Sequence, residues 1–304
     1  MRPQRPRRIA CVGHAALDHG FRVAALPAQP VKTPATSYHC SGGGMAFNAA
    51  LALSRLGATV RLLSRVGDDA PAQSLRAQLA AEGVQVQGVE TVAGTHTSVS
   101  AVVVDARGER YIFNHRGDAL ARAHALDPRQ LAGADAVLAD PRWADGAAAA
   151  LRWARKHDLP AVLDADLAPA ADLQRLVPLA GWAAFSQPGL AAFAPGLDER
   201  AALLQARASG CAVALVTRGA AGACWTRDGQ WFDCPAPRVE VQDTTGAGDV
   251  FHGALTLALA EGQRDADAVA YACAAAALKC RRGPGVAGAP RRAELERFLR
   301  ASAA

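Results

Sequence analysis

Short apolar runs alternate with helix-like stretches along the chain from residue 134 onward. The runs "ADAVLAD", "PAVLDAD", "AAFSQ" and "AVALVTRG" have the length of buried strands, and "DGAAAALRWARKHD" has the length and spacing of a helix. Strands that alternate with helices form parallel sheets, because the crossover helices pack on both faces. The pattern therefore predicts an α/β fold with a mainly parallel sheet.

The first part of the chain contains the same kinds of element. The apolar run "RRIACVGHAALD" predicts a buried strand that ends at Asp18. Apolar residues at helical spacing follow in "AFNAALALSRLG", where Gly57 is expected to end the helix before another strand. The next helix is expected to begin at Asp69 and Pro71 and to end at Gly83.

Two β-rich segments, at about residues 18–40 and 92–118, interrupt this alternation. In the second, "SVSAVVVDARGERYIFN" holds two strand-like runs around a turn at Ala106-Arg107-Gly108, which indicates a hairpin. We expect both segments to form a small β lid over a cleft, inserted into a single domain of residues 1–304. Another hairpin is expected at Asp228-Gly229 in "GACWTRDGQWFDC".

Composition narrows the class of protein. Of the 304 residues, 51% are hydrophobic and 20% are charged, which is typical of a globular protein. No apolar run reaches the ~18 residues of a membrane span, and Ile9–Val12 is too short for a signal-peptide core. We therefore expect a cytoplasmic protein with no membrane partner. Seven cysteines without a CxxC pair favour reduced, structural thiols over disulfides or zinc ligands.

The formal net charge is +5, and only Lys32, Lys156 and Lys279 among the 33 basic residues are lysines. The arginines are scattered, apart from the N-terminal tail and Arg281-Arg282. Nucleic-acid binding requires a clustered basic face, so no nucleic-acid partner is expected. A small anionic substrate explains the modest basicity equally well.

The stretch "VQDTTGAGDVFHGALTLALAEG" places small residues and a carboxylate at the start of a helix. A helix N-terminus presents unpaired N–H groups and partial positive charge, so Gly246, Ala247 and Gly248 would let a phosphate approach the backbone. Asp249 beside that anion would accept a proton from a hydroxyl that attacks a phosphoryl group. The alternative is that the preceding polar residues cap the helix and the glycines serve packing.

Two segments resemble the signatures of the ribokinase-like (PfkB) carbohydrate kinases: "SGGGMAFNAALALSRLG" and, near the C-terminus, "DTTGAGDVFHGA". The resemblance extends over essentially the whole chain. It implies a three-layer α/β/α core with a β lid, ATP as the phosphoryl donor, and Mg²⁺. It also implies Asp249 as catalytic base and Gly246, Ala247 and Gly248 as the anion hole. The chain has no GxxxxGK[ST], so it is not a P-loop kinase.

Further site residues follow from the same resemblance. Asp18 matches the acceptor of a sugar hydroxyl, and Gly43, Gly44 and Asn48 match the sugar-contacting part of the first signature. A carboxylate and an amide suit vicinal hydroxyls, since they accept and donate in fixed directions. The alternative for Asn48 is a hydrogen bond at the helix start.

The nucleotide site is implied by "VTRGAAG", where Thr217, Gly219 and Gly222 should line the phosphates. Asp243 and Thr245 match positions that bind a monovalent cation, such as K⁺, in some members; helix capping is the alternative for both. Members of the family often carry Asn-x-x-Glu where this chain reads "SQPG" at residues 186–189. We therefore assign no direct protein ligand to Mg²⁺, which usually keeps several waters.

Two further segments indicate which sugar is phosphorylated. "AVLADPRWADGA" and "AALKCRRGPGVAGAP" are similar to the sulfofructose kinases, which phosphorylate the 1-hydroxyl of 6-deoxy-6-sulfofructose. That group binds the sulfonate with a lysine, an asparagine and an arginine, which fall here on Lys32, Asn114 and Arg142. A guanidinium fork and an ammonium bind tetrahedral oxyanions well. The alternative is that Lys32 and Arg142 are solvated surface charges.

Other substrates stay open. Asn48 is typical of general sugar kinases, and His115 and Arg116 beside Asn114 would favour a dianionic phosphate. The alternatives are therefore a fructokinase, a phosphofructokinase or another sugar or sugar-acid kinase. A catalytically idle sugar-binding regulator is the alternative of another class, against which the intact Asp249 argues. A homodimer through the lid is common in the family, and exposed β edges seek partners.

Overall fold

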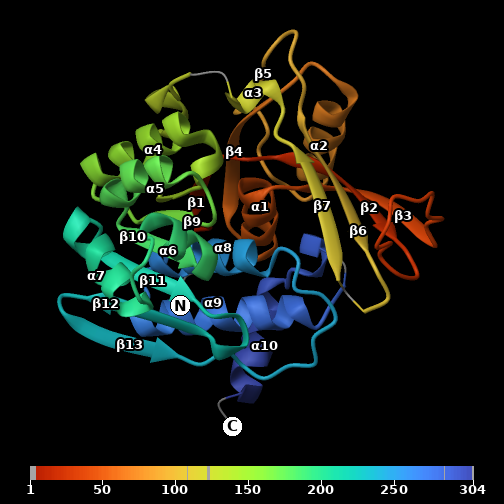
Figure 1. Cartoon of the computed structure of the whole chain (residues 1–304). Helices are drawn as coiled ribbons and strands as arrows, with labels where there is room; N and C mark the ends of the chain where they lie inside the picture. The colour runs from red at the N-terminus through yellow and green to blue at the C-terminus, as the bar shows by residue number, and fades with distance from the viewer. Residues whose placement is uncertain (1–4, 108, 122–123, 284, 303–304) are drawn as a thin grey trace.

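A mainly parallel sheet runs through the middle of the molecule (Figure 1). This computed structural model describes residues 5–107, 109–121, 124–283 and 285–302. The strand order is β13-β12-β11-β10-β9-β8-β1-β4-β5, and only the pairs β11–β12 and β12–β13 are antiparallel. The strands are β1 (Arg8–Val12), β4 (Thr59–Val66), β5 (Val89–Thr91), β8 (Ala136–Ala139), β9 (Ala161–Ala165), β10 (Trp182–Ser186), β11 (Val213–Thr217), β12 (Ala223–Arg227) and β13 (Gln230–Cys234).

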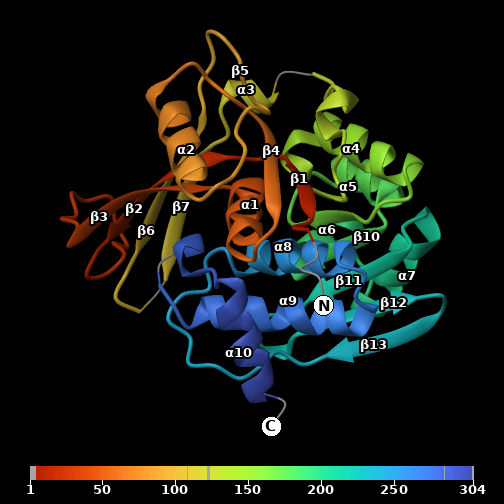
Figure 2. The same cartoon turned by 180° about the vertical axis from the view of Figure 1, so that it is seen from behind.

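Helices cover both faces of this sheet and create two apolar cores. One face carries α1 (Met45–Arg55), α2 (Ala70–Ala81), α8 (Ala247–Ala260), α9 (Asp265–Cys280) and α10 (Arg292–Ser302), of which the last three lie together in Figure 2. The other carries α3 (Asp118–Ala121), α4 (Ala144–Lys156), α5 (Ala170–Leu176), α6 (Gln187–Phe193) and α7 (Glu199–Ser209). Alternate residues of β1 enter opposite cores: Ile9 and Cys11 one, Ala10 and Val12 the other. The predicted α/β/α layering is confirmed.

The predicted helix and turn signals act as expected. Asp69 caps α2 by accepting a hydrogen bond from the N–H of Ala72. Gly57 and Gly83 follow α1 and α2 with φ of 90° and 79°, left-handed conformations that end a helix. The hairpin of β12 and β13 turns at Asp228-Gly229, where both residues have positive φ as a two-residue type I′ turn requires.

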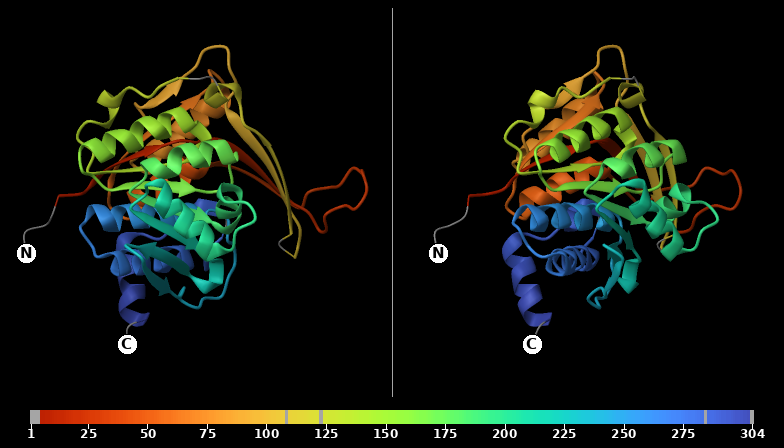
Figure 3. Two further views of the ribbon diagram at one scale, coloured as in Figure 1. Left: turned by 60° about the vertical axis from the view of Figure 1, so that its left-hand side comes forward. Right: turned by 90° about the vertical axis from the view of Figure 1, so that its left-hand side faces the viewer.

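A second, smaller sheet has the strand order β3-β2-β6-β7 and projects from the body of the molecule (Figure 3). Its strands are β2 (Ala16–Arg22), β3 (Ser37–Gly43), β6 (Ser98–Val104) and β7 (Arg110–His115). The predicted hairpin of β6 and β7 is confirmed, although Gly108 of its turn lies outside the described residues. Among the helices that the structure describes, none has the length and apolar character to cross a bilayer.

One strand prediction is wrong. The run "RRIACVGHAALD" is not a single strand ending at Asp18, because β1 stops at Val12 and β2 begins at Ala16. The chain turns at Gly13, whose φ is 150° and where a Cβ would lie 2.1 Å from the carboxylate of Asp140. Asp18 therefore lies within β2 of the small sheet.

Candidate active site

Polar residues gather where the parallel strands of the large sheet end. His14 follows β1, Asp140 follows β8, Asp166 follows β9, and Ser186 and Thr217 close β10 and β11. Parallel strands end at the same edge, which is where α/β sheets usually bind ligands. α8 packs on β8 and β9 close to these groups.

The N-terminus of α8 is open. Gly246 caps it with a left-handed φ of 77°, which glycine adopts without strain. The N–H of Ala247 donates to the carbonyl of Thr244. Gly248 and Asp249 follow in the first turn of α8, whose N–H groups have no intrahelical acceptor in a regular helix. Gly248 is exposed, and nothing lies within 4 Å of the place where its Cβ would be. The turn therefore leaves room for an anion at the N-terminus of α8.

Asp249, in the first turn of α8, is held by a side chain from α1. The Nδ2 of Asn48 donates to Oδ2 of Asp249 over 2.6 Å, while Oδ1 of Asn48 is buried without a partner among the described residues. Burial and the negative charge of Asp164 raise the pKa of Asp249 to about 7, and Asp166 adds to the rise. The Asn48 bond and the charge of His252 oppose it. A carboxyl group tuned in this way suits proton transfer near neutral pH.

A buried ion pair lies close enough to this carboxylate to influence its pKa. Nδ1 of His252, one helical turn after Asp249, is 3.0 Å from Oδ2 of Asp164 on β9, and their side chains are only 3% and 4% exposed. Burial lowers the pKa of His252, but the negative charge of Asp164 outweighs it, so the net shift is upward. The pair joins α8 to β9 of the central sheet, three residues along the helix from Asp249.

The small sheet contributes a polar row. Ser41, Asp18, Ser100 and Asn114 are register partners on its four strands, and such partners share one face. Nδ2 of Asn114 donates to Oγ of Ser100 over 3.1 Å. Burial raises the pKa of Asp18, and the hydroxyl of Ser100 opposes that rise. A Cβ at Gly43 would lie 2.0 Å from Oδ2 of Asp18, so only glycine fits there.

Two guanidinium groups lie near the row. Burial, together with the positive charges of Arg142 and Arg116, lowers the pKa of His14 to about 3, so His14 is neutral. His14 Nε2 is 2.8 Å from Oγ of Ser98, to which Asn114 also donates. Arg116 donates to the carbonyl oxygen of Arg142, and its buried Nε has no partner among the described residues. Asn114 and Arg142 thus reach one region.

Lys32 is not brought to that region by any contact. It is exposed in the loop between β2 and β3, and it has no hydrogen bond or ion pair with another described residue. Gly44, by contrast, is fixed at the start of α1, where its φ is 91° and a Cβ would meet the carbonyl of His14 at 2.6 Å. The two predicted substrate residues therefore differ sharply in how firmly the fold holds them.

The predicted nucleotide loop follows β11. Oγ1 of Thr217 donates to the carbonyl of Phe185, and Gly219 is exposed with a φ of 57°. Gly222 instead packs against the next loop, because a Cβ there would lie 2.0 Å from the carbonyl oxygen of Cys234. This close approach explains why residue 222 is a glycine. Thr217 and Gly219, by contrast, are partly or fully exposed at the end of β11.

The predicted monovalent-cation site at Asp243 and Thr245 already contains a positively charged side chain, that of Lys279. Nζ of Lys279, in the last turn of α9, donates to the carbonyl oxygen and to Oδ2 of Asp243 over 2.8 and 3.0 Å. Oδ1 of Asp243 accepts from the N–H of Thr245 over 3.0 Å. Both predicted ligands therefore lie in one loop, and that loop already holds a cation of the chain itself.

Sequence reasoning missed several of these groups. Asp140 accepts hydrogen bonds from the N–H groups of His14, Ala46 and Arg142, and so joins three elements of the site. It lies in "AVLADP", where an acid directly after a buried strand is a usable signal. Asp166 in "VLDAD" gives the same signal, whereas Asp164 lies within β9.

Comparisons with known proteins agree with one another. The pfkB family of carbohydrate kinases matches residues 6–291. The ribokinase of Bacillus subtilis (strain 168) is 31% identical over 301 residues, covering 96% of this chain and 99% of that one. A crystal structure from Agrobacterium tumefaciens, provisionally assigned as a ribokinase, has a TM-score of 0.93 and 35% identity over 98% of this chain and 99% of that one.

The fold recurs in more distant structures. Arabidopsis thaliana ribokinase, solved with ribose and ATP, has a TM-score of 0.85 at 22% identity and covers 97% of this chain and 99% of its own. The comparisons confirm the family that the two signatures predicted. The chain belongs to the pfkB family of carbohydrate kinases and is a sugar kinase.

Proposed function

We propose that this sugar kinase transfers the γ-phosphoryl group of ATP to a ketose with an anionic group at its far end, with the 1-hydroxyl of 6-deoxy-6-sulfofructose as the first candidate. The observation that carries the proposal is the pair of guanidinium groups, Arg142 and Arg116, beside neutral His14 and Asn114. A ring nitrogen that stays neutral adds no repulsion to the guanidiniums, which match tetrahedral oxyanions.

In the proposed reaction, the sugar lies between the small sheet and α8. Asp18 accepts a hydrogen bond from one hydroxyl, and the unpartnered Oδ1 of Asn48 accepts one from another. Asp249 takes the proton of the attacking hydroxyl, while Asn48 keeps its carboxylate oriented. The N–H groups of Gly248 and Asp249 stabilise the charge that develops on the transferred phosphoryl group.

Mg²⁺ supplies charge neutralisation on the ATP phosphates when bound. Asp166 fits the role of holding its waters: Oδ1 accepts from Oγ of Ser186 over 2.6 Å, and the other carboxylate oxygen has no hydrogen bond to a described residue. Ser186 in turn caps α6 by accepting from the N–H of Gly189. Ser186 stands where members of the family often carry the asparagine of Asn-x-x-Glu. Here it orients the carboxylate of Asp166, which follows the neighbouring strand β9.

The small sheet is proposed to act as a lid of a single catalytic domain. Closing it over the sugar would exclude water, which otherwise competes as phosphoryl acceptor. Its outer strands would also pair two copies as a homodimer, since Tyr38, Ile112 and Phe113 are all more than half exposed.

A second candidate is a kinase for a ketose phosphate. Two guanidinium groups near His14 supply more positive charge than a monoanionic sulfonate needs, and a dianionic phosphate would use both. A kinase screen with sulfofructose, fructose 6-phosphate, fructose, ribose and ketodeoxygluconate separates these candidates by kcat/KM. Equal efficiency on fructose and sulfofructose would favour the plain ketose kinase.

Arg142→Ala is expected to raise KM for an anionic ketose about tenfold or more, since a charged hydrogen bond contributes about 1.5–3 kcal/mol. KM for neutral fructose should hardly change, because fructose has no anion to lose. Steady-state kinetics with both sugars measure the difference. Arg129→Ala, which removes an exposed guanidinium paired with its neighbour Asp127, is the matched control. Equal losses on both sugars would instead assign Arg142 a structural role.

The kcat/KM of the kinase is expected to rise with pH through about 7, the pKa of Asp249, because only the ionised carboxylate accepts a proton. Its pKa is raised in the folded protein, so the active form is lost as pH falls below that value. A pH profile of kcat/KM with saturating ATP measures this limb. A profile that stays flat down to about pH 5 would show a base with an ordinary aspartate pKa.

A further inference from the structure

Lys279 is a fully buried lysine in the last turn of α9. Its ammonium donates to two oxygens of Asp243, the backbone carbonyl at 2.8 Å and Oδ2 at 3.0 Å. Burying a charge costs free energy unless the charge is paired and hydrogen-bonded. The folded protein therefore needs the contact between Lys279 and Asp243. Asp243 lies three residues before Gly246, in the loop that leads into α8.

Both carboxylate oxygens of Asp243 accept hydrogen bonds. Oδ2 also accepts from the N–H of Gly285 over 2.6 Å, and Oδ1 accepts from the N–H of Thr245 over 3.0 Å. Burial alone would raise the pKa of Asp243, but these N–H groups and Lys279 outweigh it and lower the pKa to about 2. The N–H of Asp243 donates to the carbonyl of Cys280, so the loop is tied to the end of α9 at several points.

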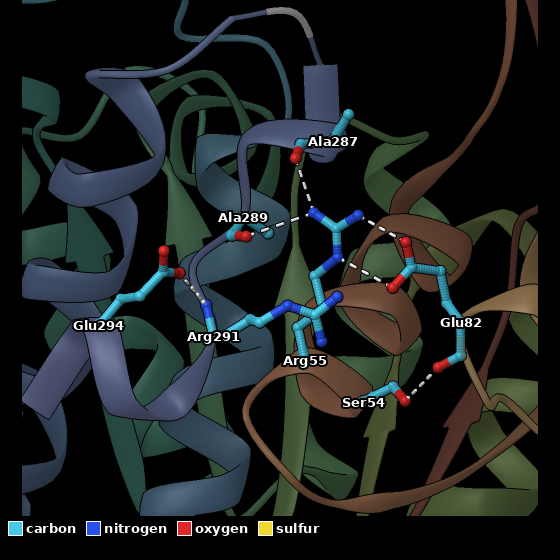
Figure 4. A network of polar contacts seen from close by, with 7 residues as sticks. All are labelled: Ser54, Arg55, Glu82, Ala287, Ala289, Arg291 and Glu294. Atoms are coloured by element: carbon cyan, nitrogen blue, oxygen red, sulfur yellow. Dashed lines mark hydrogen bonds and ion pairs between the residues drawn. The ribbon is translucent and has the colours of Figure 1, made fainter.

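The facing loop, residues 285–289, is fixed from its other side. Figure 4 shows Arg55 of α1 reaching the carbonyl oxygens of Ala287 and Ala289, at 2.6 and 3.3 Å, while its fork also binds Glu82. The N–H of Val286 lies 3.6 Å from the place of a Cβ on Gly246. The loop that binds Asp243 therefore lies directly beside the N-terminus of α8.

A monovalent cation at Asp243 and Thr245 does not fit this arrangement. The backbone carbonyl oxygen and Oδ2 of Asp243 are hard ligands that such an ion would need, and both bind the ammonium of Lys279, while Oδ1 accepts from the N–H of Thr245. A second cation beside a buried ammonium would be repelled in a medium of low polarity. The positive charge that the family resemblance assigns to K⁺ is already supplied here by the side chain of Lys279.

We propose that the ammonium of Lys279 is a tethered substitute for a monovalent cation: it holds the loop before α8 in the shape that binds the phosphates, and the kinase is independent of K⁺. The proposal rests on the function proposed for the N-terminus of α8. Lys279 is not among the residues proposed to touch sugar or ATP, so it is a positioning residue.

The first test is the cation dependence of the unaltered protein. Binding of MgATP, measured by calorimetry without sugar, and turnover with the best ketose should be equal in potassium and tetramethylammonium chloride at equal ionic strength. Equal ionic strength matters because screening alone changes the binding of a charged ligand. Tighter MgATP binding in potassium, or activation by potassium, would overturn the proposal.

The second test removes the ammonium. Lys279→Ala leaves a cavity beside Asp243 and should weaken MgATP binding and lower kcat/KM about tenfold to a hundredfold in tetramethylammonium, the usual loss for a charged hydrogen bond. Potassium or ammonium ions should restore most of both quantities and raise the Tm, because a free cation can enter the cavity. Lys279→Met fills the space with an uncharged chain and should not respond to either ion.

Lys156→Ala, at an exposed lysine near the end of α4, is the matched control and should behave as the wild type. A folded Lys279→Ala that ignores potassium and ammonium ions would overturn the proposal. If Lys279→Ala does not fold, the cation titration of the wild type still decides. Absence of ketose phosphorylation in the wild type would refute the proposed substrate class, whereas the MgATP measurements would still test Lys279.

Discussion

Asp249→Asn is expected to lower kcat by about 10²–10⁴-fold, the usual contribution of a general base. The amide has the shape of the carboxylate but cannot accept the hydroxyl proton. Asn48 would lose its charged acceptor at 2.6 Å, yet the N–H groups at the start of α8 stay in place. Binding of ATP and sugar should therefore remain close to that of the wild type, so kcat falls while the dissociation constants hold.

Rapid-quench turnover and calorimetric titration with each substrate separate these two effects. Asp267→Asn, at an exposed carboxylate paired with Arg264, is the control for the loss of one negative charge. The role of Asp249 is refuted if the variant keeps more than half of the wild-type kcat. A loss of ATP affinity as large as the loss of kcat would instead indicate that Asp249 shapes the phosphate site.

His252→Leu is expected to lower the free energy of unfolding by about 3–5 kcal/mol, because it leaves the buried carboxylate of Asp164 without its counter-charge. Urea unfolding near pH 6 measures the loss. The double variant Asp164→Asn with His252→Leu should recover part of it, since no uncompensated charge then remains. A single variant within about 1 kcal/mol of the wild type would show that the pair is not an ion pair in solution.

The exposed pair of His96 and Asp118, 3.2 Å apart, supplies the matched control. His96→Leu should cost less than about 1 kcal/mol, because solvent screens that pair. The buried pair also has a defined pH dependence. The folded pKa of His252 lies above its ordinary 6.5, so its contribution is complete below about pH 6.5 and is lost as pH rises through the folded value.

Short-range patterns in the sequence were sufficient to predict the α/β/α layers and the motif at the start of α8. Apolar periodicity reports which side of an element is buried, and β1 indeed sends alternate residues into the two cores. Glycine stops such as Gly57 and caps such as Asp69 act within a few residues, so they are visible without the fold. The signature around Asp249 likewise includes Gly246, the residue that begins α8, so this helix start can also be predicted from the sequence.

The boundary between the two sheets was not visible in this way. From Ile9 to Leu17 only Gly13 and His14 interrupt the apolar residues, because both β1 and the start of β2 are buried. What divides them is Gly13, whose conformation is needed to pass the carboxylate of Asp140, a residue far away in the chain. A pattern of apolar residues reports burial and not which sheet a strand joins.

The electrostatic design of the site was decided by tertiary structure alone. Asp164 and His252 are distant in sequence, as are Asp243 and Lys279, and each pair forms only when α8 and α9 pack on the sheet. The sequence by itself therefore determined the order of elements, the family signatures and the proposed base, all of which depend on neighbours along the chain. The tertiary structure decided which charges are buried together, because desolvation and pairing depend on distances in space that no local pattern encodes.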